Sequence, residues 1–572
     1  MDSFEARLNG IEKSFARLNT EHEKFSFLFA SLQSQDEHEG VPFSHLYGHT
    51  NNPTTRREPD AELQKETQAI LRLLERNNIS PASFLSFVTS HDESMDPIWG
   101  NVSAIDILGN TTERESFDTR DFTLAFIASG DLRNVIKTVN LLPDGYNGKL
   151  NILLNDRNPL VVARNVLILS ALSIIDDTDQ AVDFALHLWY SVFLPMKGSF
   201  LASGSLIQRL VTSHDGQFDL TQTSTMSLSI SATTMDAILA DLKFGEVDPG
   251  TANNALNAVM NAPERVDYRD RVYARLKPSH RVAFQAWRQF GLLMPFGAPN
   301  PHLNRPNPSL VTPSGQLWLY DSAIPLAGWD IYDVLKAGRE HGTTEEDIIG
   351  CLHYHVKDQL TTFSRRLRKF SISFSMYDQN AIELSDTLPL HLRQFDRIEV
   401  SNIVDREYVG VFPMLTKWGP LLNRDQPDST LVASFINWAA QAPGARATHD
   451  QGLFDPCLKR LLKVRPDIVN PIDMLRGPAS AAMMTAMSSL ELVHDTSPAF
   501  RKYLTDIGAD TAARKAGLRM RERNQIVPPR PYVPIRSEWD ALPDISTKEH
   551  WYNKFVLSGV NHTERFVEWV LS

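Results

Sequence analysis

Short apolar runs, each ended by turn residues, set the pattern of the chain from residue 122 to about 173. Residues 122–128 are almost entirely apolar and stop at Ser129-Gly130-Asp131, as is typical of a buried strand. Residues 132–142 carry apolar side chains at helical spacing, residues 150–154 repeat the strand pattern, and Pro159 opens a second helix. Because the connections are short, this order predicts a parallel βαβ unit.

Three more strand patterns occur far along the chain, at residues 369–376, 395–401 and 430–436. The segment before them is mainly helical in pattern, with a loop rich in Pro and Asn at residues 296–313. We therefore predict one α/β domain with a parallel sheet, whose halves are residues 96–178 and 344–440. Residues 179–343 would form a mainly helical insertion, and residues 441–572 a mainly helical C-terminal region.

The N-terminal residues 1–95 predict a helical region with a polar linker at about 33–60. A short apolar stripe at heptad spacing marks its first helix, formed by Phe4, Leu8, Ile11, Phe15 and Leu18. Two heptads favour a helix that docks on its own core over a coiled coil or partner helix.

Composition narrows the class of protein. The 572 residues allow three or four domains by length, but the dispersed strand patterns favour one enlarged sheet domain. The net charge of −12 argues against nucleic acid as a partner. The sequence shows no secretory signal, no apolar run long enough for a bilayer, and only two cysteines, so we expect a cytoplasmic protein without a membrane anchor.

Candidate chemistry outside the strand ends is sparse. The chain has neither a Gly-x-Ser-x-Gly elbow after a strand nor a phosphate-binding Walker loop. Cys351 and His355 would share a helix face, but no third ligand is evident, so we expect no metal site. The basic run at residues 365–369 is expected to be solvated. Asp396 and Arg397 would either pair at a strand end or line a crevice.

Two groups of motifs resemble a known family. The first comprises Trp99-Gly-Asn-Val-Ser-Ala-Ile-Asp-Ile107, Ala128-Ser-Gly-Asp-Leu-Arg-Asn-Val135 and Leu154-Asn-Asp-Arg-Asn-Pro159; the second comprises Phe395-Asp-Arg-Ile-Glu-Val-Ser-Asn-Ile403 and Trp418-Gly-Pro-Leu-Leu-Asn423. They resemble fungal proteins that carry the domain of unknown function 4470, and a related domain opens dynein axonemal assembly factor 3. The resemblance extends from about residue 99 to residue 438.

The resemblance implies a Rossmann-like fold, similar to class I methyltransferases that use S-adenosylmethionine. In such a fold, a turn after the first strand and acidic residues after the second and third would hold the cofactor. These positions are Ser129, Gly130, Asp131, Asp156 and Asp378, and Ser401 and Asn402 would face the substrate. The turn departs from the methyltransferase pattern because Gly130 is its only glycine. Asp131 could instead cap the following helix, and Asp156 could make a turn.

Three functions follow from this resemblance. We expect an interaction or assembly factor that works by binding an unidentified protein partner. The alternatives are a methyltransferase with an unknown acceptor and a pseudoenzyme that binds S-adenosylmethionine. Fold-level analogy carries all three expectations.

Overall fold

The computed structural model describes residue 76 and residues 98–109, 118–196, 204–210, 216–243, 245–468 and 481–572. The predicted N-terminal helices and the linker at 33–60 lie outside these residues. The contacts divide the chain after Asp96, and the unit from Pro97 to Ser572 contains the whole sheet. Among the described residues, no helix combines the length and the apolar character needed to cross a membrane.

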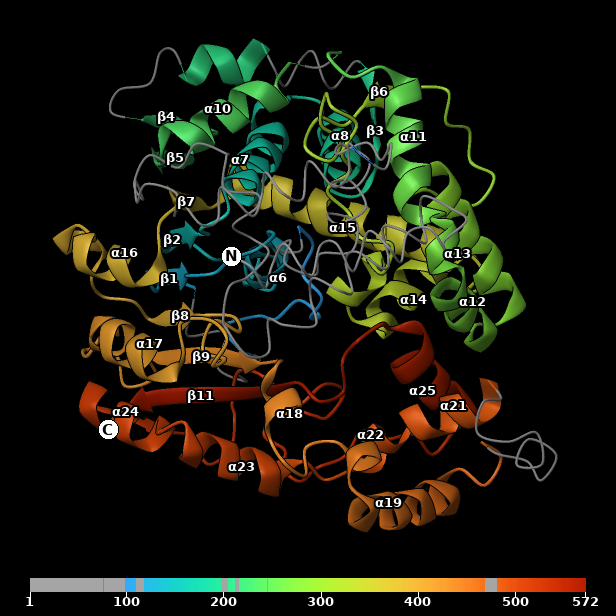
Figure 1. Ribbon diagram of the computed structural model, residues 1–572. Coiled ribbons are helices and arrows are strands. Elements are labelled where there is room, and N and C mark those ends of the chain that lie inside the picture. Colours follow the sequence, from blue (N-terminus) through green and yellow to red (C-terminus); the bar gives the residue numbers. More distant parts are fainter. Residues whose placement is uncertain are drawn as a thin grey trace. The chain divides into compact units, whose positions relative to one another are not determined.

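Nine strands form one mixed sheet in the order β10-β11-β9-β8-β1-β2-β7-β5-β4 (Figure 1). Its strands are β1 (Phe122–Phe126), β2 (Lys149–Asn155), β4 (Gln217–Asp219), β5 (Ser224–Ser229), β7 (Ser371–Tyr377), β8 (Arg397–Glu399), β9 (Thr430–Phe435), β10 (Leu518–Met520) and β11 (Arg565–Leu571). The six from β9 to β5 are mutually parallel. The other three, β4, β10 and β11, pair antiparallel. The prediction of an α/β chain with a mostly parallel sheet is confirmed.

Helices cover both faces of this sheet, because successive strand side chains point to opposite sides. Leu124, Ile152 and Phe374 belong to one core cluster, and Ala125 and Leu153 belong to a second one. The first cluster includes residues of α6 (Arg133–Asn140), α7 (Pro159–Ile174), α8 (Thr178–Tyr190) and α15 (Ile348–Lys369). The second includes residues of α16 (Ala381–Thr387), α17 (Val411–Trp418), α23 (Ser497–Asp506) and α24 (Ala509–Ala516).

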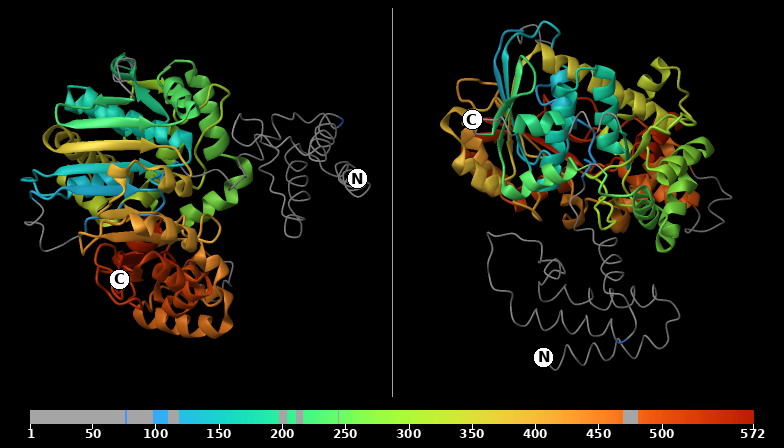
Figure 2. Two further views of the ribbon diagram at one scale, coloured as in Figure 1. Left: turned by 90° about the vertical axis from the view of Figure 1, so that its left-hand side faces the viewer. Right: turned by 90° about the horizontal axis from the view of Figure 1, so that it is seen from above.

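The remaining helices lie mostly in the insertion and in the C-terminal region. They are α10 (Ala232–Asp241), α11 (Pro249–Met260), α12 (Val266–Arg275), α13 (Pro278–Phe290), α14 (Ile331–Glu340), α18 (Trp438–Gln441), α19 (Gln451–Val464), α21 (Ala481–Ser488), α22 (Leu490–Val493) and α25 (Lys548–Trp551). In the left view of Figure 2 the sheet runs from the strands of the insertion, through β7, β2 and β1, to the strands of the C-terminal region.

Six strands went unpredicted, and one of them, β6, lies in a segment that was expected to be loop. The insertion supplies β4 and β5, and the C-terminal region supplies β10 and β11, so the sheet does not end at residue 436. The segment 296–313, expected to be loop, contains β6 (Leu303–Pro306), which pairs with β3 (Phe193–Pro195). These strands are short or carry polar residues, so the hydrophobic pattern does not reveal them.

The basic run at the end of α15 is solvated only in part, because Arg365 and Lys369 are exposed whereas Arg366 is buried and Arg368 half-buried. Arg366 donates from Nη1 to the carbonyl oxygens of Val139 (2.9 Å) and Leu142 (2.6 Å), at the carboxyl end of α6. Arg368 donates to the carbonyl oxygen of Leu172 (2.8 Å), near the end of α7. Helix carboxyl ends attract cations because their last carbonyls are unsatisfied, so these arginines fasten α15 to two helices.

Replacing Arg366 by alanine is therefore expected to lower the free energy of unfolding by about 2 kcal/mol, because buried carbonyl oxygens lose a charged donor. Urea unfolding followed by circular dichroism measures this loss. Arg365 is exposed beside it, and we expect Arg365→Ala to change the free energy by less than about 0.5 kcal/mol. Equal effects of the two substitutions would contradict the fastening role of Arg366.

Candidate functional site

The strand order reverses between β1 and β8, since β2 and β7 follow on one side of β1 while β8 and β9 follow on the other. In open parallel sheets, ligands bind beyond the carboxyl ends of the strands at such a point. The predicted site residues all lie in the segments that follow these carboxyl ends. This edge of the sheet is therefore the candidate site.

The turn after β1 is fastened by side chains from the next strand and helix. Gly130 has a φ of +53°, and no heavy atom lies within 4 Å of the position a Cβ would take. Its N–H donates to Asp156 Oδ2 (2.9 Å), and its carbonyl oxygen accepts from Asn165 Nδ2 (2.7 Å). The glycine is needed for its left-handed backbone rather than for lack of room, and the space beside it is open.

The other oxygen of Asp156 also has a backbone partner, because Oδ1 accepts the N–H of Asn158 at 2.9 Å. The sequence placed Gly130 and Asp156 in one predicted cofactor site and offered a turn role for Asp156 as the alternative; the structure brings these two residues into direct contact. The hydrogen bond from the N–H of Asn158 shows that Asp156 makes this turn.

A buried asparagine that the sequence analysis overlooked ties three strand ends together. Asn155 Nδ2 donates to the carbonyl oxygens of Ile127 (2.9 Å) and Gln379 (3.0 Å), and its Oδ1 accepts the N–H of Gln379 (3.0 Å). Because these residues follow β1 and β7, the carboxyl ends of three neighbouring strands are held in register. The sequence signal that could have revealed Asn155 is its place at the end of a buried apolar run, because a buried polar side chain needs hydrogen-bond partners.

Asp131 faces a different segment. Its Oδ2 accepts the N–H of Gly100 (2.9 Å), and its Oδ1 accepts Nε (2.6 Å) and the backbone N–H (3.2 Å) of Arg133. The carboxylate thus receives the first N–H of α6, although the N-cap position is Leu132 rather than Asp131, and it also forms a buried ion pair. Asp131 is only 6% exposed, so this pair is a fixed part of the interior.

The side chain of Arg133 fills the space beside Asp131. A Cβ on Gly100 would lie 1.3 Å from Arg133 Nη2, and one on Gly328 would lie 2.8 Å from Nη1. The guanidinium also donates from Nη1 to the carbonyl oxygen of Val102. The two glycines therefore make room for an arginine that locks residues 100–102 against the turn after β1.

The hydrogen-bond donors to the Asp378 carboxylate lie in the insertion. Its Oδ2 accepts the N–H of Ser231 (2.8 Å) and the hydroxyls of Ser231 (2.5 Å) and Thr234 (2.6 Å), at the start of α10. The structure thus gives the three predicted carboxylates, Asp131, Asp156 and Asp378, separate partners in three segments.

The end of β8 carries a buried acid and the two predicted substrate-facing residues. Glu399 Oε1 accepts the N–H of Ser401 at 2.7 Å. Ser401 has a φ of +49°, which is unusual for serine, and its hydroxyl lies 3.5 Å from Asn402 Oδ1. Burial raises the pKa of Glu399 to about 7, so this carboxyl takes up a proton near neutral pH.

This pKa predicts a specific pH dependence. Folding keeps Glu399 protonated to a higher pH than in the unfolded chain. Its contribution to the free energy of unfolding is therefore full below about pH 4.5 and falls as the pH rises to about 7. The fall amounts to about 3 kcal/mol. Glu399→Gln removes it, so the variant should gain stability relative to the wild type between about pH 5 and pH 8 in urea unfolding. A constant difference between the two proteins over this range would refute the buried, partly protonated carboxyl.

Cys351, His355 and their neighbour His353 have other partners. His353 Nδ1 lies 3.0 Å from the carbonyl oxygen of Leu293, Cys351 Sγ donates to the carbonyl oxygen of Thr344 (3.4 Å), and His355 packs edge-on against Trp329. Burial raises the pKa of the Cys351 thiol to about 12, which disfavours the thiolate that binds metals. Within the described part of the chain, no three His, Cys, Asp or Glu residues are placed to hold a metal ion.

Comparison with known proteins shows that one part of the chain is similar to a known family. No curated protein and no solved structure matches the sequence. Residues 98–194 match the model of a family described as a domain of unknown function, DUF4470. The matched segment includes Gly100, the turn at Ser129-Gly130-Asp131, Arg133 and Asp156, so the bonds of Asp131 and Asp156 lie within it, whereas Asp378 and Glu399 lie outside it.

Proposed function

We propose that this chain is a non-catalytic interaction or assembly factor built on a methyltransferase-like sheet. The strand order supports the fold part of this proposal. In the order β7-β2-β1-β8-β9, numbering along the chain gives 3-2-1-4-5, as in doubly wound nucleotide-binding sheets. The antiparallel β11 next to β9 is consistent with a Rossmann-like, class I methyltransferase arrangement.

The functional part of the proposal rests on the hydrogen bonds that the three carboxylates accept. A carboxylate that holds a ribose or an adenine must offer free oxygen lone pairs to the ligand. Asp131, Asp156 and Asp378 already accept hydrogen bonds from the chain, and Arg133 fills the space beside Asp131. These bonds hold the three carboxylates toward three different segments rather than toward one ligand, which favours a scaffold over a catalyst.

The partner would be a protein, by analogy with dynein axonemal assembly factor 3, which has a domain related to the family that the motifs resemble. In a fungus this partner would not be an axonemal dynein, because most fungi lack motile cilia. We also propose a cytoplasmic location, and the net charge of −12 supports partners other than nucleic acid. These points rest on analogy and charge.

One observation favours the alternative, a methyltransferase or a pseudoenzyme that binds S-adenosylmethionine. The open space beside Gly130 would admit a ligand to the turn after β1. S-adenosylmethionine would then rest against Ser129 and Gly130 and recruit Asp156, and Ser401 and Asn402 would face the acceptor.

A thermal-shift titration separates the two proposals. A ligand at a hundred times its Kd stabilises the folded state by about 2.7 kcal/mol, whereas a protein that does not bind it is unaffected. We expect no shift with millimolar S-adenosylmethionine or with its demethylated product. A shift that Asp156→Ala abolishes would overturn the scaffold proposal and favour the cofactor-binding alternative.

A further inference from the structure

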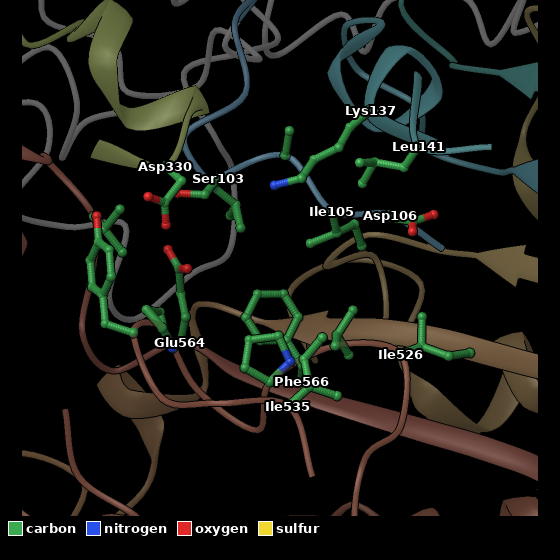
Figure 3. Close-up of a pocket in the computed structure, with 17 residues that line it drawn as sticks. Ser103, Ile105, Asp106, Lys137, Leu141, Asp330, Ile526, Ile535, Glu564 and Phe566 are labelled. Carbon is green, nitrogen blue, oxygen red and sulfur yellow. The ribbon is translucent and has the colours of Figure 1, made fainter. Parts of the chain in front are cut away.

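A cavity of about 330 Å³ lies between the segment 102–106, the helix α6, the loop 526–535 and the start of β11 (Figure 3). Its volume falls in the range of small-molecule sites. Most of its wall is apolar, formed among others by Val102, Ile105, Leu141, Ile526, Val560 and Phe566.

Glu564 is the exceptional residue of this wall. It immediately precedes β11, is 1% exposed and points into the cavity (Figure 3). Neither of its carboxyl oxygens has a hydrogen-bond partner in the described structure. The cation that acts on it through space, Arg133, is already bonded to Asp131 and Val102. A buried polar group without partners is costly, and such groups are kept where a ligand completes them.

The other charges of the cavity balance each other in part. Asp330 caps α14 by accepting the N–H groups of Tyr332 (2.8 Å) and Asp333 (3.3 Å). The ammonium of Lys137 extends into the same cavity and attracts the Asp330 carboxylate. Asp106 also lines the wall, so the cavity has three carboxyl groups and one ammonium. Glu564 is the one of these three whose two oxygens have no hydrogen-bond partner in the described structure, so a donor group beside it would satisfy them.

We propose that this cavity binds a primary amine with an apolar body, whose ammonium group donates hydrogen bonds to Glu564. The apolar part of the ligand would fill the space between Ile105, Ile526 and Phe566. This inference does not depend on the proposed scaffold function, because the cavity and the turn at Gly130 are lined by different residues.

Binding should displace a proton. Burial raises the pKa of Glu564 well above its ordinary value, so the free cavity holds the neutral acid. The charged groups that act on it or share the cavity are Arg133, Lys137, Asp330 and Asp106, and the Tyr532 phenol also lines the wall. When an ammonium arrives, the carboxyl ionises and its proton passes to the solvent, whereas the amine keeps its own.

Calorimetry of the full chain with phenethylamine tests the proposal. In two buffers of different ionisation enthalpy near pH 7, we expect binding with release of close to one proton per ligand. The matched probes phenethyl alcohol and 3-phenylpropionate lack the ammonium and should bind at least about tenfold more weakly. Equal binding of the alcohol, or no binding of the amine, would overturn the proposal.

Two variants locate the interaction. Glu564→Gln preserves the shape of the cavity and should weaken phenethylamine about tenfold and abolish proton release, whereas Glu549→Gln, at an exposed position, should leave both unchanged. Lys137→Met removes a like charge and should strengthen binding severalfold. Undiminished binding by Glu564→Gln would overturn the assignment; if that variant does not fold, unchanged or weaker binding by Lys137→Met would do so.

Discussion

Replacing Glu568 by alanine is expected to lower the free energy of unfolding by about 4 kcal/mol. Glu568 lies in β11 and is fully buried. Its Oε1 accepts the N–H groups of Gln525 (2.9 Å), Ile526 (2.7 Å) and Val527 (3.0 Å). Arg521 Nε also lies 3.3 Å from its Oε2. The substitution would leave three N–H donors and a half-buried guanidinium without their acceptor, and it would release the loop 525–527 from the sheet.

Urea unfolding monitored by tryptophan fluorescence measures this effect. The matched control is Glu522→Ala, because Glu522 is exposed on the same chain segment and should change stability by less than about 0.5 kcal/mol. Glu568→Gln retains one acceptor oxygen and should fall between the two. A loss below about 1 kcal/mol for Glu568→Ala would contradict the anchoring role.

The second large effect is expected for Asp396→Ala, with a loss of about 3 kcal/mol. Asp396 immediately precedes β8 and is 4% exposed. Its Oδ1 pairs with Arg120 Nη2 (3.1 Å), and its Oδ2 accepts the N–H of Thr123 (2.8 Å). Its neighbour Arg397 pairs with Asp428 (3.1 Å). Of the two roles that the sequence left open, the structure shows pairing at a strand end.

The control for this substitution is Asp425→Ala, which changes an exposed carboxylate of the same sign in a nearby turn. Denaturant unfolding of both variants, with equal slopes, would report their stabilities directly. If Asp396→Ala proved no more destabilising than its control, the ion pairs at the amino end of β8 would contribute nothing measurable.

The central strands were predictable because β1, β2 and β9 contain short buried apolar runs, whereas β7 and β8 lie in segments that alternate apolar and polar residues. The sequence patterns located β1, β2, β7, β8 and β9 within a few residues. The pattern of β11 does not reveal a strand, because Arg565 and Glu568 interrupt it. Their burial depends on distant partners: Arg565 donates to Thr496 Oγ1 (3.0 Å) and to the carbonyl oxygen of Trp539 (2.8 Å). Pairing of this kind is nonlocal, so a local pattern cannot report it.

In the candidate site, too, the contacts that follow from strand order were predictable, and those that depend on distant packing were not. The proximity of Gly130 and Asp156 follows from adjacent parallel strands, which bring their carboxyl ends to one edge. The orientation of Asp378 toward α10 depends on where the insertion packs, which no strand-end rule specifies. The same holds for Arg133, whose place depends on glycines at positions 100 and 328, far apart in the sequence.

Hydrogen exchange of the peptide 128–134, with and without millimolar S-adenosylmethionine, tests the central claim most directly. The bond from the Gly130 N–H to Asp156 should protect this turn in the free protein. The account predicts slow exchange that the ligand leaves unchanged, because the carboxylates are already bonded within the chain. Rapid exchange in the free protein that becomes slow with S-adenosylmethionine would contradict it.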